Sequence, residues 1–496
     1  MANSGSKLTS SMFWSFSQSI GSQLIGIIIS TILARLMMPE AYGIIAAAHI
    51  FTGIATTFVS GSFANVIIQK KDADAKDCDT IFWWNIIFSS ILYVVLFFSA
   101  PIIVNVFNQS FDRELLVKVI RVLGIGVVLA SFNSFYRAFL QKKLQFKKIF
   151  LLTLSGTLVS AVIGIAMAYK GLGVWALVAQ NVLSYAINSI LFLIFSHWVP
   201  HFYFSFIRFK NMFSYGAKML LSGVLITVQK DLTQIAIGNR YTADSLAYYN
   251  KGINYPKLFA LNIVTSINAA LFPVMSQISD QQKLKDLVRK FNRISAFVMT
   301  PMMFGFAAVG PSFIELLLTD RWSFAIPFLQ ICCFTYAIQP LGMSSLQYLR
   351  ATGRATEYLV LDIIRKAISV ILLFCAFALD EGVIYMALAE LLSNFIAILV
   401  NFYPGKKHLD YKIREQIADV LPKFLLSGVM FAFVYCLGWI NLPLFFKFIL
   451  QVFSGIVIYV GCAKVFRMQE FCELILIIRN LLSKKKSQSS NSKDES

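Results

Sequence analysis

Long apolar stretches recur from one end of the chain to the other, and short polar segments separate them. Each stretch has at least about 20 residues, the length that a helix needs to cross roughly 30 Å of hydrocarbon. No strand-like alternation competes with this pattern, which favours helices over a β-barrel. The pattern predicts an all-α integral membrane protein with fourteen transmembrane helices, at residues 12–34, 42–67, 81–106, 115–140, 149–169, 172–196, 212–239, 246–272, 294–318, 323–349, 357–379, 382–403, 420–440 and 443–466.

Four of these predicted helices carry polar residues that fall on one face when projected at about 3.6 residues per turn. In 212–239 and 246–272 the stripes are Lys218, Ser222, Gln229 and Thr233, and Asn250, Asn254, Lys257, Thr265 and Asn268. In 12–34 and 42–67 they are Ser11, Ser15, Gln18 and Ser22, and His49, Thr52, Thr56 and Ser60. Charges at membrane depth usually face a bundle interior or a wet cavity, so the stripes predict a shared polar cavity. The alternative is hydrogen bonding between packed helices.

The charges of the connecting loops predict the orientation of the chain. Loops on the side of the two termini hold 29 Lys and Arg residues, and loops on the other side hold five. Basic residues are concentrated in cytoplasmic loops, so we expect both termini in the cytoplasm. The net charge of +19 is then a membrane-anchoring feature, and we expect no nucleic acid partner.

Composition excludes an ordinary soluble protein, because only 14% of the 496 residues are charged and 57% are apolar. The seven cysteines lie mostly inside apolar stretches, without ligand or disulfide spacing. His197 and His201 are four residues apart, but Pro200 between them breaks the helix that would align them as ligands, so we expect no metal site. We also expect no cofactor. No loop is longer than about 20 residues, and the polar end of the chain after Ser483 is typical of a disordered tail.

Two halves are indicated by a weak internal repeat, because the first and seventh helices both end in arginine before a short turn and a tyrosine. Parallel repeats are a known transporter plan, with a substrate site near the midplane. The predicted organisation is a six-helix lobe at 1–208, a second six-helix lobe at 209–404, two additional helices at 405–466 and a cytoplasmic tail at 467–496.

Seven segments in order resemble one family. They are LARLMMPEAYG (33–43), FANVIIQKKD (63–72), RAFLQKKLQFKK (137–148), GVWALVAQ (173–180), LFPVMSQISD (271–280), DRWSFAIPFLQI (320–331) and LRATGRATEYLVLDIIRK (349–366). They are similar to bacterial polysaccharide exporters of the Wzx, teichuronic acid and colanic acid type. These exporters belong to the multidrug/oligosaccharidyl-lipid/polysaccharide (MOP) exporter superfamily.

The resemblance implies two six-helix lobes in a V shape with two extra helices and a cavity lined by the first, second, seventh and eighth helices. It also implies a flippase of the inner membrane. Its substrate would be an undecaprenyl-diphosphate-linked oligosaccharide, moved from the cytoplasmic to the outer leaflet for surface polysaccharide synthesis. The expected partners are this lipid-linked oligosaccharide, membrane lipids and polysaccharide polymerase machinery.

Such a substrate needs cations for its diphosphate and hydrogen-bonding groups for its sugars. Lys218 and Lys257 are our candidates for the diphosphate, with Lys257 as the main contact. Gln18, His49, Gln229 and Asn254 are the candidates for sugar hydroxyls.

Other intramembrane charges have different explanations. Asp231 and Glu390 are candidates for coupling transport to a proton or Na⁺, although Asp231 is equally suited to pairing with a basic residue of another helix. Asp362 precedes Arg365 and Lys366 by three and four residues, so we expect it to neutralise them along its own helix.

Two competing functions remain. A multidrug exporter of the same superfamily would need an acidic cavity for cationic drugs, whereas the predicted cavity is basic. A membrane glycosyltransferase or polymerase would need positioned acid, base or metal residues, usually on sizeable loops, and this chain offers no such loop. The sequence therefore favours a transporter and not an enzyme.

Overall fold

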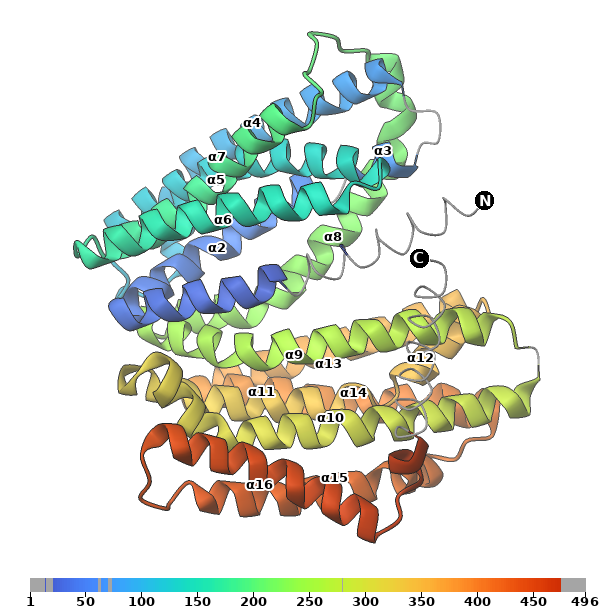
Figure 1. Ribbon diagram of the computed structural model, residues 1–496. Coiled ribbons are helices and arrows are strands. Elements are labelled where there is room, and N and C mark those ends of the chain that lie inside the picture. Colours follow the sequence, from blue (N-terminus) through green and yellow to red (C-terminus); the bar gives the residue numbers. More distant parts are fainter. Residues whose placement is uncertain (1–13, 15–20, 61–63, 70–73, 279, 474–496) are drawn as a thin grey trace, which may run out of the picture. The chain divides into compact units, whose positions relative to one another are not determined.

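The computed structural model describes residues 14, 21–60, 64–69, 74–278 and 280–473, and every regular element within them is a helix (Figure 1). A helix at Gly21–Leu36 is followed by α2 (Pro39–Ser60), α3 (Ala64–Gln69), α4 (Ala75–Ile103), η1 (Val104–Val106), α5 (Arg113–Lys142), α6 (Phe146–Tyr169), α7 (Val174–Phe195) and α8 (Phe206–Arg240). The chain continues with α9 (Ala243–Ser276), α10 (Gln281–Leu318), η2 (Asp320–Ala325), α11 (Ile326–Ile338), α12 (Met343–Ala351), α13 (Ala355–Leu379), α14 (Val383–Leu409), α15 (Ile413–Leu437) and α16 (Leu444–Val465).

Nine helices of the described residues are long and apolar enough to cross a membrane. They are α2, α4 with η1, α5, α6, α7, α10, α14, α15 and α16. Helices also form at the predicted positions of α8, α9 and α13, which carry more polar and charged residues. The all-α membrane fold is therefore confirmed, whereas the count of fourteen spans is not.

The span predicted at 323–349 is broken. The segment Asp320–Ile338 bends by 46° against Met343–Ala351. Pro340 lies in the connecting turn, and Gly342 takes a positive φ of 76° just before α12. A Cβ at Gly342 would also come within 2.6 Å of the Asn401 Cβ, so this position needs glycine for its conformation and for its close contact with α14.

Contacts divide the chain into two compact units, Met1–Asn250 and Lys251–Ser496. The division therefore falls within α9 and not near residue 208, where the sequence suggested the lobes would separate. The reason is that α8 packs on α2 inside the first unit, where the Thr57 and Thr227 hydroxyl oxygens lie 3.1 Å apart. The grouping of α8 and α9 into a second six-helix lobe, and the V-shaped arrangement, stay predictions.

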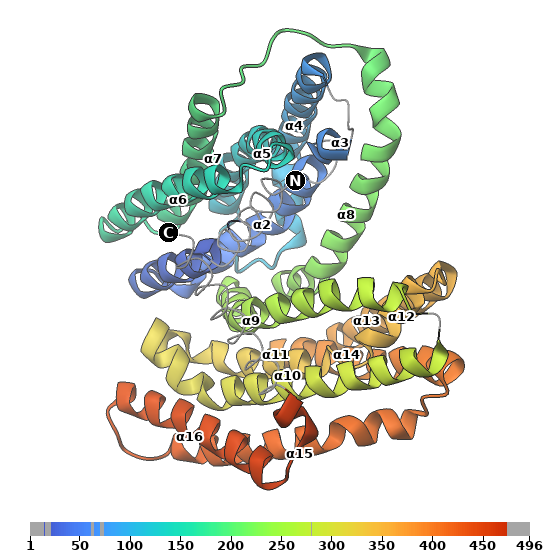
Figure 2. The same ribbon diagram turned by 45° about the vertical axis from the view of Figure 1, so that its right-hand side comes forward.

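In the first unit α5 is the central helix, in contact with α2, α4 and α7. Aromatic side chains fill the core around it, including fully buried Phe135, Tyr136 and Phe192. Figure 2 shows the extended segment that connects α7 to α8. This segment is held to α4 by Asp79, which accepts a hydrogen bond from the His201 backbone N–H at 3.0 Å.

In the second unit α10 is the central helix and contacts α11, α15 and α16. The two C-terminal helices α15 and α16 contact each other, with the Gln451 amide of α16 donating to the Val434 carbonyl of α15 at 3.1 Å. Polar contacts fix them on α10, because the Tyr459 hydroxyl donates to the Phe297 carbonyl at 3.0 Å and the Thr300 and Ser427 hydroxyl oxygens lie 2.9 Å apart. The two additional helices predicted by the sequence thus pack on the second unit.

Candidate functional site

A small polar pocket of about 150 Å³ lies within the first unit between α2, α5 and α7. Its lining consists of His49, Thr52, Gly53, Thr56, Leu123, Gly126, Asn181, Val182 and Tyr185. Three of the four residues of the predicted stripe on α2 therefore lie together in one pocket. The fourth, Ser60, is the last residue of α2, and its side chain lies outside what the structure describes.

The polar groups of this pocket are held in place by their own helices. The Thr52 and Thr56 hydroxyls donate to the carbonyls of Ala48 and Thr52, at 3.0 and 2.7 Å. The Asn181 amide N–H donates to the Leu177 carbonyl at 2.8 Å. A hydroxyl or amide group that donates a hydrogen bond can in general also accept one, and imidazole and phenol groups can do either. The described lining includes no carboxylate, so the pocket suits a neutral, hydroxyl-bearing ligand.

Two glycines create the space of the pocket. A Cβ at Gly53 would meet nothing within 4 Å, so the position borders open volume. A Cβ at Gly126 would touch the Tyr185 ring at 3.4 Å, so this glycine lets α5 and α7 come together. Sequence reasoning missed the contributions of α5 and α7, because only α2 carries a periodic polar stripe at this pocket.

In the second unit, Lys257 of α9 and Glu390 of α14 both lie within electrostatic range of the buried Cys332 thiol of α11. The thiol donates to the Ile253 carbonyl, one turn before Lys257, at 3.6 Å. Lys257, the candidate phosphate ligand, and Glu390, the candidate ion-coupling acid, therefore lie on two helices that each contact α11.

The remaining predicted site residues are spread over α8 and α9. Gln229 is half-buried and Asn254 is exposed. Asp231 is half-buried and accepts a hydrogen bond from the Gln234 amide at 3.2 Å. Gln18 and the side chain of Lys218 lie outside the residues that the structure describes. Among the described residues, no group of three or more His, Cys, Asp or Glu side chains could hold a metal ion.

Lys251 is another intramembrane lysine of α9, and the structure gives it a packing role. Its side chain is only 6% exposed, and its ammonium lies 5.5 Å from the centre of the fully buried Trp322 ring. A cation over an aromatic face is stabilised by the ring quadrupole. Asp362 also has its expected structural role, since it pairs with Arg365 at 2.6 Å and Lys366 at 3.1 Å, which confirms that prediction.

Sequence reasoning missed a charge network that follows α16. Glu470 is 3% exposed and accepts from Arg293 at 2.5 Å and from Lys423 at 2.9 Å. Next to it, Asp419 accepts from Arg289 at 2.6 Å and from the Tyr411 hydroxyl at 2.7 Å. Arg289, Arg293 and Lys423 were counted as loop charges. Their partners lie 47 to 177 positions away in sequence, beyond the reach of helical spacing.

Residues 32–327, more than half of the chain, match the family described as polysaccharide biosynthesis protein. The chain belongs to this family. It is 24% identical over 422 residues to the lipopolysaccharide biosynthesis protein WzxC of Escherichia coli (strain K12), which covers 84% of each protein. It is 25% identical over 388 residues to the teichuronic acid biosynthesis protein TuaB of Bacillus subtilis (strain 168), which covers 76% of this chain and 78% of TuaB.

Solved structures share the fold of this polysaccharide biosynthesis family member. The lipid II flippase MurJ, in an inward closed conformation, aligns with a TM-score of 0.71 at 17% identity, over 94% of this chain and 100% of MurJ. An inward-facing multidrug resistance MATE transporter of the MOP superfamily aligns with a TM-score of 0.62 at 16% identity, over 80% of this chain and 98% of that one. The resemblance inferred from the seven segments is thus confirmed.

These findings define the class of the protein. It is a multi-pass membrane protein of a polysaccharide biosynthesis family. The match at 32–327 includes the pocket around His49 and the charged stretch of α8 and α9.

Proposed function

We propose that this protein flips an undecaprenyl-diphosphate-linked oligosaccharide from the cytoplasmic to the outer leaflet of the inner membrane, by alternating access of its two halves. The observation that carries the proposal is the pocket around His49, whose described lining offers hydrogen-bonding groups without a carboxylate. Sugar hydroxyls need such neutral partners. The name of MurJ, a lipid II flippase, supports transport of a lipid-linked sugar, and the name of WzxC supports polysaccharide biosynthesis.

The diphosphate of the substrate is assigned to Lys218 and Lys257, with Lys257 as the main contact. Glu390 on α14 is a candidate to bind the coupling proton or Na⁺, and so is Asp231 on α8. Gln18, Gln229 and Asn254 extend the set of groups for the sugar. Both termini are assigned to the cytoplasm because of the distribution of basic residues between loops.

The proposal is tested by filling the pocket. Gly53→Leu adds a side chain at a position that borders open volume, so it should displace sugar while the helix itself is strengthened. Gly461→Leu is the matched control, because Gly461 of α16 also has nothing within 4 Å of its Cβ position and lies in the other unit. In a strain that lacks the native gene, surface polysaccharide should fall about tenfold with Gly53→Leu, equivalent to roughly 1.4 kcal/mol, and stay normal with Gly461→Leu.

Protein abundance and lipid-linked oligosaccharide are measured in the same cells. Normal abundance with substrate accumulating on the cytoplasmic side would support a block in flipping. Normal export by Gly53→Leu at normal abundance would contradict the role of the pocket.

A double substitution tests whether Lys257 binds the diphosphate or only offsets the charge of Glu390. Lys257→Ala should reduce export because an ammonium in a low-dielectric site contributes strongly to phosphate binding. If Lys257 binds diphosphate, Lys257→Ala combined with Glu390→Ala should remain defective. Recovery of export in the double variant would show instead that Lys257 only offsets the carboxylate.

A further inference from the structure

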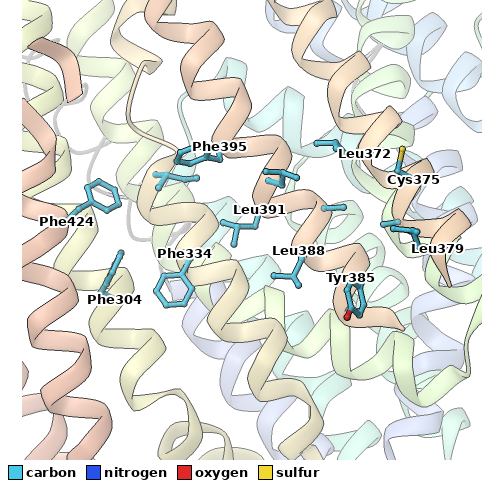
Figure 3. A pocket seen from close by; sticks show the side chains of 14 residues that line it. Phe304, Phe334, Leu372, Cys375, Leu379, Tyr385, Leu388, Leu391, Phe395 and Phe424 are labelled. Atoms are coloured by element: carbon cyan, nitrogen blue, oxygen red, sulfur yellow. The ribbon is translucent and has the colours of Figure 1, made fainter. Parts of the chain in front are cut away.

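The helix α14 of the second unit has one apolar and one polar face. Leu391 and Phe395 belong to the apolar face, which lines a groove of leucine and phenylalanine side chains (Figure 3). Glu390, Asn394 and Asn401 belong to the other face, because steps of four and seven residues return to the same side of a helix. The candidate coupling acid Glu390 is therefore followed along its own helix by two amides.

This polar face meets the broken span α11–α12 at both of its ends. Beside Glu390, the Cys332 thiol and the Tyr336 hydroxyl of α11 lie within electrostatic range of its carboxylate. Eleven residues further along α14, or roughly 16 Å at 1.5 Å per residue, is Asn401. Its Cβ lies 2.6 Å from the point that a Cβ at Gly342 would occupy, just before α12. The break between α11 and α12 thus lies against the Asn401 end of the face.

Four buried side-chain oxygens in this part of the second unit have no hydrogen-bond partner among the residues that the structure describes. They are Gln339 Oε1, Ser345 Oγ, Asn401 Oδ1 and Gln416 Oε1. Buried polar groups are nearly always hydrogen-bonded, and ordered water is their usual partner where the protein supplies none. These four oxygens therefore indicate internal water where α11, α12, α14 and α15 come together.

Two of the four oxygens belong to side chains that lie over the same glycine of α14. The Ser345 Oγ lies 3.3 Å, and the Gln416 amide nitrogen 3.0 Å, from the point that a Cβ at Gly405 would occupy. The orientation of this amide is fixed, because its NH₂ group donates to the Phe402 and Tyr411 carbonyls at 3.1 and 2.7 Å. The amide oxygen must then accept from a donor outside the described residues, and water is such a donor.

A chain of polar contacts leads from the start of α12 to the surface of the second unit. The Ser344 hydroxyl donates to Asn292 Oδ1 at 2.5 Å, and the Asn292 side chain also interacts with Tyr411. The Tyr411 hydroxyl donates to Asp419 at 2.7 Å, and Asp419 pairs with Arg289, whose side chain is 44% exposed. This outer end lies on the side of the basic loops, which the sequence predicts to be cytoplasmic.

We infer that internal water along this path carries the coupling proton between Glu390 and the cytoplasmic side of the membrane, an inference that rests on the proposed function. A proton that leaves the Glu390 carboxyl passes to the nearest water, moves along the chain of waters and is released at the surface, while the carboxylate stays behind. Amide and hydroxyl side chains suit such a path, because they orient water by hydrogen bonds and remain neutral.

The other titratable groups around Glu390 do not replace it as the proton site. Thiols and phenols such as Cys332 and Tyr336 ordinarily release a proton only above about pH 8. Lys257 of α9 lies within electrostatic range of the same thiol. On α13, which also packs on α14, Asp362 is engaged in the ion pairs described above. The carboxyl of Glu390 is therefore the group at the inner end of the path.

Water on the path is tested with single cysteines in a full-length chain whose seven native cysteines are replaced. Ser345→Cys and Ser427→Cys are a matched pair, because both serines are fully buried in the second unit but the Ser427 hydroxyl is paired with Thr300 at 2.9 Å. In inside-out membrane vesicles, a small methanethiosulfonate reagent should modify Ser345→Cys about tenfold faster, because the reaction needs a water-accessible thiolate. Equal rates would contradict a hydrated path.

Proton coupling is tested in proteoliposomes that contain a fluorescent lipid-linked oligosaccharide. With the outside one pH unit more acidic, the native chain should move the lipid outward about tenfold faster than without a gradient. Asn401→Leu and Glu390→Gln should lose this acceleration and keep the gradient-free rate, which structural damage would also lower. Gln451→Leu is the control, since it removes another buried amide with an unpaired oxygen, on α16 and outside the path. Normal acceleration with Asn401→Leu would overturn the inference.

The two experiments also separate this inference from the proposed function. Transport by the native chain that a pH gradient does not accelerate would support the flippase and contradict the proton path. Rapid modification of Ser345→Cys in a chain that moves no lipid-linked oligosaccharide would support the water and contradict the flippase.

Discussion

At the scale of single residues, position Gly43 shows how closely two helices approach in the first unit. A Cβ at this position would lie 1.8 Å from the carbonyl oxygen of Ala243 at the start of α9. The backbone cannot move away cheaply, because α2 also packs on α5 and α8. The close contact of α2 with the start of α9 therefore requires glycine at position 43.

Gly43→Ala should therefore destabilise the protein by about 2 kcal/mol, the usual cost of overpacking. The thermal midpoint of the purified protein in detergent checks this. Gly26→Ala is the control, since a Cβ at Gly26 meets nothing within 4 Å and alanine favours a helix. An equal midpoint for the two variants would mean that the contact between Gly43 and Ala243 does not exist.

Residue positions on one helix were predictable, whereas residue pairs across helices were not. His49, Thr52 and Thr56 were placed together by helical spacing, and so were Asp362, Arg365 and Lys366, because the helix geometry alone determines which residues share a face. Asn181 and Tyr185 of α7 also line this pocket. Glu470 accepts a hydrogen bond from Arg293, which is distant from it in sequence. Such neighbours depend on which helices pack together, and one sequence contains no record of that.

At the scale of elements, the segment after α16 is fixed to α10 and α15 by buried charges. Glu470 bonds to both Arg293 and Lys423, and the Lys423 side chain is only 6% exposed. Removing one partner of a buried ion pair costs roughly 3–5 kcal/mol because the other charge is left unpaired. This network holds the C-terminal helix pair on the second unit.

Glu470→Ala should lower the unfolding free energy by about 3 kcal/mol, at the low end of that range because Lys423 keeps its hydrogen bond to the Asp419 carbonyl. Glu473→Ala is the matched control, because Glu473 pairs with Lys290 at 3.0 Å with both side chains well exposed, and such pairs contribute about 0–1 kcal/mol. Chemical unfolding of the purified variants measures the difference. A loss as small as that of Glu473→Ala would contradict a buried clamp.

The ionisation of Glu470 should make the stability of the folded protein depend on pH. Burial tends to raise the pKa of Glu470, but the hydrogen bonds from Lys423 and Arg293 outweigh burial and hold the pKa below its ordinary value of 4.5. The folded state therefore binds this proton less readily than the unfolded state, so the stabilisation is complete above about pH 4.5 and is lost as the pH falls below it. Glu470→Gln should flatten this acid-dependent part of the thermal midpoint, and an unchanged pH profile would contradict the assignment.

At the scale of the whole molecule, the apolar pattern was sufficient to predict the class and the helices. The membrane fold follows from the need to pair every backbone group inside the hydrocarbon, which leaves the helix as the solution for stretches of this length. The number of spans and the division of the chain were harder to predict. α8 and α9 carry enough polar residues to differ from ordinary spans, and α8 packs with the first unit instead of beginning the second.

The orientation of the chain is a prediction at this scale. Both termini should be cytoplasmic because the loops on their side hold 29 Lys and Arg residues, against five in the loops on the other side. A green fluorescent protein fused after Ser496 should fluoresce, and an alkaline phosphatase at the same position should be inactive. The opposite pair of results would reverse the orientation.

The central claim is that the protein itself moves a lipid-linked oligosaccharide between leaflets, and transport in proteoliposomes of the purified chain tests it most directly. The vesicles contain an undecaprenyl-diphosphate oligosaccharide with a fluorescent sugar, and a membrane-impermeant quencher reports how much of it is exposed outside. The account predicts that the exposed fraction rises quickly with the native chain and with Gly461→Leu, and slowly with Gly53→Leu. Exposure at the rate of protein-free vesicles, from native protein that is folded and correctly inserted, would contradict it.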